Sequence, residues 1–556
     1  MLHARGSLLT IDVGEQTATI EPIDDILQSF IGGRGVGTKL AHKRIPFDAD
    51  PFGSENSLFF TTGPMQISNM SFTGRMNCTS ISPLTDGLLS SNAGGYLSRN
   101  FTDTGYSAVE ITGSADDLLA IHITDENVEF ETVPELHEAT IDETGDYFEK
   151  TRDLGEDQLV AIGPAGENRV RFAAVMTTSH RAFGRGGLGA VLGSKNVKAV
   201  SFAGQSPPEI DISSTQMDVH REAATDDNIM KRQGTTSVTA LANEMDAFPT
   251  RYFEKQSFEG ADKIGGEAVE QKKHTRGTCS NCAFACKLPT KDEKTGLETE
   301  GPEYETVMAF GGNAMVDDIV AIMKSNDLCD NFGLDTISAG DVVAAYLKAE
   351  DEFGNVELVH ELLHKIAYRE EEGDLLAEGI NRFADELGVK DWTSKGMEFP
   401  AHDGRRLNGQ GLSFATANRG ADHMYAEMYS YEYPLVSKED AIDPTGVAGK
   451  ASLLIDAENE NAINDSGIIC KFSGSYLNRE RYENLLDADY EDLLEIGSQI
   501  VDLERHFNNQ RGFDRTDDTL PYEIEGLDSA LDDYYSRRGW KKDGTVPNGV
   551  TAIRNT

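Results

Sequence analysis

The sequence predicts an α+β protein, with a β-rich part at the front of the chain followed by a larger helical part. Strand-like patterns fill the early part of the chain, and apolar residues recur at helical spacing after the Gln-Ser-Pro-Pro segment at 205–208. Because proline and serine are typical of linkers, we expect the β-rich part to end near residue 205 and the helical part to begin near residue 209. A length of 556 residues allows several such domains.

Two hairpins are predicted in the first domain. Residues 7–13 and 17–23 alternate in the manner of strands around the turn at 14–16, and residues 118–124 and 128–133 do so around 125–127. Residues 197–202 form a further predicted strand. Later in the chain, the spacing of apolar residues predicts helices over 319–328, 356–368 and 490–506.

The charge balance is strongly acidic. The chain has 95 acidic and 50 basic residues, which gives a formal net charge of −45, and the acidic excess is spread along the whole length. Nucleic acid is excluded as a partner because phosphate binding needs a basic surface. A distributed acidic excess is typical of a halophilic protein, since molar salt shortens the Debye length to about 3 Å and screens self-repulsion. With no signal-peptide pattern and no apolar stretch of membrane-spanning length, we expect a cytoplasmic protein that does not contact membranes.

Four of the six cysteines are spaced like the ligands of one iron–sulfur cluster. Cys279, Cys282 and Cys286 lie within eight residues, and Cys470 follows 184 residues after Cys286. Such clusters are held by four thiolates and carry electrons, which indicates redox chemistry. Structural zinc stays open as an alternative, although its sites usually pair two Cys-x-x-Cys knuckles. Six cysteines are too few for a disulfide framework in a chain of this length.

A glycine run and an internal repeat are further candidates for binding sites. Residues 184–189 match Gly-x-Gly-x-x-Gly, but the short stretch before the strand at 197–202 argues against a dinucleotide-binding unit. Its backbone N–H groups still suit an anion, with Arg181 and Arg185 beside them. The segments 330–335 and 465–470 each place an acid before an apolar turn that contains glycine, 135 positions apart. Chance similarity of two short turns is the alternative explanation.

Isolated polar residues carry little weight by themselves, but together they form a recognisable set. A lone His423 is more often structural than catalytic, and a lone Glu305 near a Gly-Pro turn is more often a cap or a solvated acid. The chain as a whole, however, resembles the tungsten-containing aldehyde:ferredoxin oxidoreductase family. The stretches that carry the resemblance are 90–96, 162–168, 180–189, 298–305, 333–338 and 515–521, together with the cysteine spacing.

The resemblance implies a β-sandwich-like base domain over 1–205 and two mainly helical domains over 209–400 and 401–556. It also implies a bis-molybdopterin centre between the base and the helical domains, with tungsten or less commonly molybdenum held by the pterins. It implies a 4Fe-4S cluster on Cys279, Cys282, Cys286 and Cys470, with Arg75 between cluster and pterin. Asp330, Leu334 and Asp335 would hold one pterin, and Asp465, Ile469 and Cys470 the other. Further implied cofactor-lining residues are Asn92, Gly94, Arg181, Ala182, Gly184, Arg419 and Tyr425, with the carbonyl oxygens of Asn92 and Ala182 on magnesium. Glu305 and His423 would move protons beside the metal.

The implied function is oxidation of aldehydes to carboxylic acids, with electrons passing through the cluster to ferredoxin. The alternatives are a family member with a narrow substrate, such as formaldehyde or a sugar-phosphate aldehyde, and a pterin-free iron–sulfur or zinc protein. A homodimer is left open, but no interface metal is expected because Lys324 and Asp327 replace the usual ligand pair. Two departures from the family stand out: the order Gly467-Ile468 in the second repeat, and the run His402-Asp403-Gly404-Arg405-Arg406.

Overall fold

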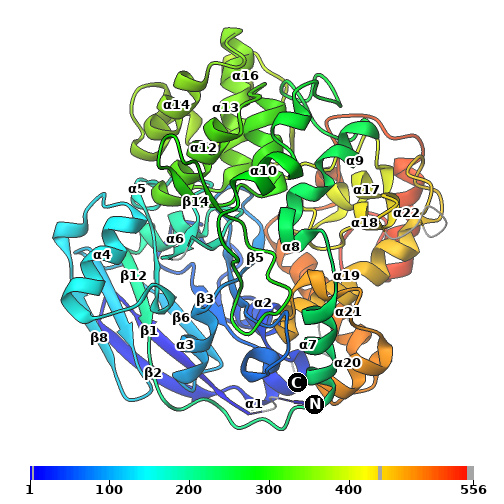
Figure 1. The fold of residues 1–556 in the computed structure, drawn as a ribbon. Helices are drawn as coiled ribbons and strands as arrows, with labels where there is room; N and C mark the ends of the chain where they lie inside the picture. The colour runs from blue at the N-terminus through cyan, green and yellow to red at the C-terminus, as the bar shows by residue number, and fades with distance from the viewer. Residues whose placement is uncertain (3–4, 179, 436–440, 548–556) are drawn as a thin grey trace.

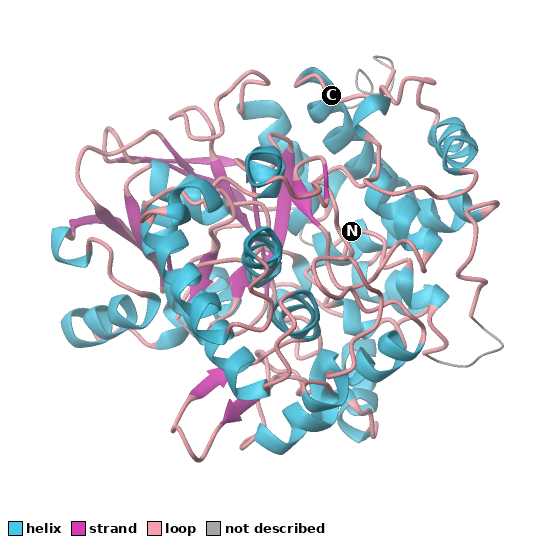
Figure 2. Ribbon diagram, turned by 90° about the horizontal axis from the view of Figure 1, so that it is seen from above, coloured by secondary structure: helices cyan, strands magenta, loops and turns pink. Residues whose placement is uncertain are grey.

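The computed structural model describes residues 1–2, 5–178, 180–435 and 441–547. Strands gather in one part of the molecule, at the lower left of Figure 1, and helices surround them above and to the right. The view from above separates the same two regions, with the long strands on one side (Figure 2). The expected α+β architecture is confirmed: an N-terminal domain of two sheets precedes a largely helical region.

The N-terminal domain contains two six-stranded sheets. The first has the order β2-β1-β6-β3-β4-β5, with β1 Ser7–Asp12, β2 Thr17–Pro22, β3 Leu58–Thr61, β4 Met76–Ile81, β5 Leu88–Ala93 and β6 Ala108–Thr112. The second has the order β11-β10-β9-β12-β7-β8, with β7 Leu119–Ile123, β8 Val128–Thr132, β9 Leu159–Ala161, β10 Val175–Thr177, β11 Ala182–Phe183 and β12 Val197–Phe202. Both predicted hairpins, β1–β2 and β7–β8, are present as antiparallel pairs.

The glycine run serves packing between the two sheets. Helix α6 (Leu188–Ser194) is buried along its whole length and contacts β3 and β4 of one sheet and β10 and β12 of the other. A Cβ on Gly189 would lie 2.3 Å from the Ala174 carbonyl oxygen, and one on Gly193 would lie 2.0 Å from that of Gly166. Glycine is therefore required because the helix touches neighbouring backbone. A helix this short between β11 and β12 agrees with the argument against a dinucleotide site.

Helices of the N-terminal domain are α1 Asp24–Phe30, α2 Gly33–Arg44, α3 Leu97–Asp103, α4 Ile141–Arg152, α5 Pro164–Glu167 and α6. The helical region contains α7 Thr215–Thr225, α8 Met230–Gln233, α9 Thr239–Glu244, α10 Gly266–Lys272, α11 Tyr304–Thr306, α12 Ile319–Phe332, α13 Thr336–Glu350, α14 Val356–Tyr368, α15 Glu372–Leu376, α16 Ile380–Leu387, α17 Asn408–Thr416, α18 Tyr429–Glu432, α19 Lys450–Gly467, α20 Arg479–Leu486, α21 Tyr490–Gln510 and α22 Leu527–Arg538. The three predicted helices correspond to α12, α14 and α21. Short hairpins β13–β14 (Pro289–Lys291, Glu298–Glu300) and β15–β16 (Thr393–Ser394, Met397–Glu398) complete the region.

The internal repeat is a repeated helix end. Gly333, with φ 74°, directly follows α12, and Ile468, with φ 62°, directly follows α19. The backbone therefore turns in the left-handed conformation at the end of both helices. The next residue closes the same bond in each case: the N–H of Leu334 donates to the Cys329 carbonyl, and that of Ile469 donates to the Asn464 carbonyl, both at 2.8 Å. This is a common way to satisfy helix C-terminal carbonyls. The segments 330–335 and 465–470 are therefore similar because each forms the same kind of helix C-terminus.

In the part of the chain that the structure describes, no helix is both long and apolar enough to cross a membrane. All six cysteines are free thiols.

Candidate functional site

Backbone contacts gather the four cysteines from distant segments. The N–H of Cys470 donates to the Phe72 carbonyl at 2.7 Å, and the N–H of Ser280 donates to the Gly95 carbonyl at 2.9 Å. The Ala283 N–H donates to the Ser71 hydroxyl at 2.9 Å. Both cysteine segments are thus fixed to the same loops of the N-terminal domain, which is how residues so far apart in sequence reach one place.

The loop that carries three cysteines is tightly wound. Asn281 and Ala285 adopt left-handed backbone conformations, with φ 54° and 51°. Gly94 permits the close approach of the loop, because a Cβ there would lie 3.2 Å from Cys279 Sγ. The rings of Phe72, Phe284 and Tyr476 pack in a neighbouring cluster, with Phe72 centred 5.3 Å from Phe284 and 5.0 Å from Tyr476. These thiols therefore have an apolar wall on one side.

Burial and mutual repulsion disfavour the thiolate form of these cysteines. Burial raises the pKa of Cys282 and Cys286, and the nearby Cys470 and Cys279 raise it further. An Arg75 N–H donates to Cys470 Sγ at 3.2 Å. Burial opposes the charge on Arg75, yet Cys470 and Cys279 keep its pKa above the ordinary value. Cysteine binds a metal as the deprotonated thiolate, so iron bound here would displace protons from the thiols. Among the described residues, no three His, Cys, Asp or Glu side chains are grouped so as to hold a single metal ion.

The first repeat loop is attached to the second sheet. The N–H of Asp335 donates to the Phe172 carbonyl at 3.1 Å, and the N–H of Ala174 donates to the Gly333 carbonyl at 2.8 Å. Asp335 Oδ2 also accepts from Arg185 at 3.4 Å. Burial raises the pKa of Asp330, which lies 3.6 Å from the imidazole of His180. Leu334 is buried in this loop, and a Cβ on Gly184 would lie 3.9 Å from Asp335 Oδ1.

The second repeat loop is attached to the first sheet and to α2. Asp465 accepts from the Asn92 amide at 2.8 Å and lies 3.3 Å from Arg34 and 3.1 Å from Lys471. Arg34 also donates to both carboxylate oxygens of Glu504, at 2.8 Å each. Ile469 is fully buried in the loop. Each repeat loop therefore places a carboxylate against an arginine of the N-terminal domain, Asp335 against Arg185 and Asp465 against Arg34.

Arg419 and Tyr425 lie beside the second loop. Arg419 donates to the Ser90 carbonyl on β5 at 2.7 Å, two residues from Asn92, and Tyr425 reaches the same oxygen at 3.4 Å. The Tyr425 ring lies under the guanidinium of Arg34 at 3.5 Å and that of Arg419 at 4.6 Å. Cation–π contacts of this kind are strengthened by burial.

The structure brings Glu305 and His423 together. Glu305 Oε1 lies 3.3 Å from His423 Nε2, and Oε2 accepts from the Ala401 N–H at 2.6 Å. A buried π-helical segment, Val307–Asn313, follows Glu305 closely, and such segments often mark functional sites. The other ring nitrogen of His423, Nδ1, is buried and has no hydrogen-bond partner in the described structure. A buried polar atom left unpaired is costly, which favours a role in holding substrate.

His402 is a third member of this site that the sequence had indicated only as a departure from the family. Its Nε2 lies 3.6 Å from Glu305 Oε1, and its ring stacks on Tyr429 at 3.6 Å with 4° between the planes. Burial, and then the neighbouring His423, lower the pKa of His402 well below the ordinary value, so this imidazole is neutral. Stacking fixes the ring plane and so fixes the nitrogen that faces Glu305.

Two arginines connect the parts of the site. Arg185, bound to Asp335, also donates to the carbonyls of Ala421 at 2.7 Å and Glu398 at 2.5 Å, and so links the first loop to the segment before His423. Arg181 donates to Glu300 at 2.6 Å, and the charges of Cys279 and Cys286 help to raise its pKa against burial. The Arg181 Nε is buried and unpaired in the described structure. Ala182 follows directly as the first residue of β11.

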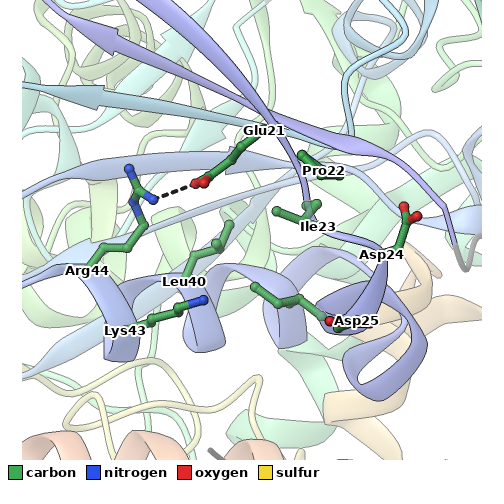
Figure 3. Close-up of a pocket in the computed structure, with 9 residues that line it drawn as sticks. Glu21, Pro22, Ile23, Asp24, Asp25, Leu40, Lys43 and Arg44 are labelled. Atoms are coloured by element: carbon green, nitrogen blue, oxygen red, sulfur yellow. Dashed lines mark hydrogen bonds and ion pairs between the residues drawn. The ribbon is translucent and has the colours of Figure 1, made fainter. Parts of the chain in front are cut away.

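A separate pocket of about 280 Å³ lies between the end of β2 and helices α1 and α2 (Figure 3). Its charged lining residues are Glu21, Asp24, Asp25, Lys43 and Arg44, and Arg44 donates to Glu21 at 2.6 Å. None of the residues proposed from the sequence lines it. This pocket is therefore distinct from the site around Glu305 and the cysteines.

Comparison with known proteins settles the family. Residues 8–204 match the N-terminal domain of aldehyde ferredoxin oxidoreductase, and residues 213–551 match its domains 2 and 3. The chain belongs to the aldehyde ferredoxin oxidoreductase family.

Relatives within this family cover almost the whole chain. The tungsten-containing aldehyde ferredoxin oxidoreductases of Thermococcus kodakarensis and Pyrococcus furiosus are each 34% identical over 98% of this chain and 97% of the relative. A more distant relative, the WOR-like subunit of an aliphatic sulfonate oxidoreductase of Pyrococcus furiosus, is 27% identical over 91% of this chain and 86% of its own. Among solved structures, the BamBC active-site complex of benzoyl coenzyme A reductase has the same fold, with a TM-score of 0.84 at 20% identity over 100% of this chain and 97% of that one. The protein is thus an oxidoreductase of this family.

Proposed function

We propose that this protein oxidises aldehydes to carboxylic acids at a tungsten bis-molybdopterin centre and passes the electrons through a 4Fe-4S cluster to ferredoxin. The observation that carries the proposal is the Glu305–His423 pair, 3.3 Å apart, with an unpaired His423 nitrogen beside it. Relatives at 34% identity that are named as tungsten-containing aldehyde enzymes support the choice of metal and substrate class.

The residues present fit these cofactors. Four free thiols are the donor set of a 4Fe-4S cluster, and Cys279, Cys282, Cys286 and Cys470 would hold it. The unpaired Arg181 Nε and the buried guanidinium of Arg75 suit the anionic groups of a pterin, and Arg419, which is paired with Asp422, would line the same region. Asp330, Leu334 and Asp335 would contact one pterin, and Asp465, Ile469 and Cys470 the other, with Asn92, Gly94, Ala182, Gly184 and Tyr425 lining the same region. No described contact supports the expected magnesium ion, and the proposed centre does not include it.

The overall reaction converts an aldehyde and water into a carboxylic acid, two protons and two electrons. When bound, the metal–pterin centre supplies the two-electron redox chemistry. Glu305 accepts a proton from water or from the hydrated aldehyde at Oε1, which faces His423 and His402, while Oε2 is engaged by the Ala401 N–H. With the Nε2–H of His423 directed at the Glu305 carboxylate, His423 Nδ1 accepts a hydrogen bond from a hydroxyl of the hydrated aldehyde. Neutral His402 keeps Glu305 oriented without competing for its proton.

Replacement of Glu305 by Gln tests the proton-transfer role. We expect kcat for aldehyde-dependent reduction of benzyl viologen to fall roughly 100-fold or more, because a positioned general base contributes that much. Metal content should stay at about four iron and one tungsten per chain. Glu298→Gln, on β14 and paired with Lys291 at the surface, is the matched control and should leave turnover unchanged. Normal turnover in Glu305→Gln would remove the assignment.

Elemental analysis and a substrate panel separate the alternatives. Zinc without tungsten would contradict the proposal and favour a pterin-free protein. A panel that includes formaldehyde, a sugar-phosphate aldehyde and longer aldehydes distinguishes a narrow from a broad enzyme. Cytoplasmic location, a homodimer and the domain division at 209–400 and 401–556 stay predictions.

A further inference from the structure

The loop that holds three cysteines is locally basic in a strongly acidic chain. Between Glu270 and Asp292 the sequence contains no acidic residue, whereas it contains Lys272, Lys273, Arg276, Lys287 and Lys291. The chain as a whole has nearly two acidic residues for every basic one. A window of this length without an acid is therefore unusual here, and it coincides with the proposed cluster.

Three basic side chains around this loop are bonded to backbone carbonyls and have no carboxylate partner among the described residues. Arg276 donates to the Ala283 carbonyl at 2.9 Å, Lys273 donates to the Lys231 carbonyl at 2.8 Å, and Lys231 donates to the Ala223 carbonyl at 2.8 Å. Backbone carbonyls orient these groups but do not neutralise them. Within the described parts of the chain, no carboxylate lies at ion-pair distance from any of the three. The nearby acids have other partners: Asp226 accepts from the Tyr476 hydroxyl, and Asp227 lies 3.6 Å from Arg232. Glu300 and Glu303, whose charges act on Lys273, lie 2.6 Å and 3.7 Å from Arg181.

The three cations surround the proposed cluster site at the surface. Arg276 is exposed and bonds to the backbone between Cys282 and Cys286. Lys231, on α8, lies 6.0 Å from the ring centre of Phe284 in the same stretch. Helix α8 packs against α10, whose end precedes Lys273 and Arg276 (Figure 1). Asn281, between the first two cysteines, is exposed, so solvent reaches the loop within one residue of a thiol.

We propose that Lys231, Lys273 and Arg276, around Asn281, form the docking surface for an acidic one-electron carrier protein of the ferredoxin type. This inference rests on the proposed function. Each docked carrier takes one electron from the cluster, so one aldehyde, which releases two electrons, reduces two carriers. The rest of the surface, with its large acidic excess, would place like charges against an acidic partner, and such juxtaposition disfavours association.

The docking surface binds its partner through charges in direct contact, and long-range electrostatic attraction does not contribute. At about 1 M salt the Debye length is only 3 Å, so long-range steering is screened, while partly buried pairs across an interface are screened much less. We therefore expect charge reversal at these positions to raise KM for the carrier at high salt as well as at low salt.

The test compares two electron acceptors with the intact holoenzyme. In Lys231→Glu/Arg276→Glu, we expect kcat/KM for an acidic ferredoxin to fall about tenfold or more, with aldehyde-dependent reduction of benzyl viologen at least as fast as in the wild type. Arg169→Glu is the matched control, because Arg169 is exposed beyond α5 on the N-terminal domain. Arg276→Gln, which keeps a donor for the Ala283 carbonyl but removes the charge, should give a smaller loss in the same direction. Iron content and the cluster absorption of each variant verify that the loop is intact.

The outcomes separate the two proposals. The docking surface would be overturned if the double variant and Arg276→Gln, with intact clusters, both gave the same kcat/KM for ferredoxin as Arg169→Glu. The enzyme assignment would then still stand. Absence of aldehyde-dependent viologen reduction in the wild type would instead overturn the proposed function and the docking surface with it.

Discussion

Removal of the Arg34 side chain should destabilise the protein more than removal of a charged side chain on the surface does. Arg34 is 1% exposed, donates to both oxygens of Glu504, lies 3.3 Å from Asp465 and stacks on Tyr425. Arg34→Met fills much of the same volume but leaves the buried Glu504 carboxylate without a cation, while Asp465 keeps only Lys471, at 3.1 Å. Breaking a buried ion pair in this way costs about 3–5 kcal/mol. We expect the free energy of the first unfolding transition to fall by that amount.

Urea unfolding followed by circular dichroism at constant high salt measures this change. Arg537→Met is the control, because Arg537 is half exposed and pairs with Asp533 on the surface of α22, where such pairs contribute about 0.5 kcal/mol. In Arg34→Met/Glu504→Gln one orphaned charge is gone, so the double variant should be more stable than the sum of the single changes predicts, by about 1 kcal/mol or more. A loss in Arg34→Met as small as that in Arg537→Met would refute the reasoning.

Two further predictions concern backbone strain and pH. Ile468→Gly should be more stable than Ile468→Ala by about 1 kcal/mol, because both empty the same buried site but only glycine adopts φ 62° without strain; the reverse order in urea would contradict this. Burial, and then His506, lower the pKa of His42 from 6.5 to about 4, so between these pH values the unfolded chain binds a proton that the folded chain does not. Stability should fall as pH falls through this window, and His42→Phe should flatten the slope; an unchanged slope would exclude His42 as its source.

The parts of the site that the sequence revealed are those with a local signature. The cysteine spacing identified a cluster of thiols because three of its members lie within eight residues. The repeat at 330–335 and 465–470 was visible because a helix that ends in the left-handed conformation constrains several residues in a row. Gly333 takes that conformation in the first segment and Ile468 in the second. Resemblance to a family then supplied Glu305 and His423, which the structure places in contact distance.

Residues whose partners lie far away in sequence gave no such signal. Arg34 meets Glu504 across 470 positions, and nothing near either residue indicates the pairing. The Gly32-Gly33 pair before Arg34 was a usable hint, since a Cβ on Gly33 would lie 2.1 Å from the Asp465 carbonyl oxygen. His402 acquires its role from Tyr429 stacking and from Glu305, and only the folded chain brings these three together.

The scattered origin of the thiols sets a timetable for biosynthesis. Cys286 leaves the ribosome 184 residues before Cys470, an interval of roughly 10–40 s at ordinary rates of synthesis. Throughout that time the nascent polypeptide carries three of the four proposed cluster ligands, and the Phe72 carbonyl has not yet met the Cys470 N–H. Under the proposed function, machinery that loads iron and sulfide would therefore act on an almost finished chain.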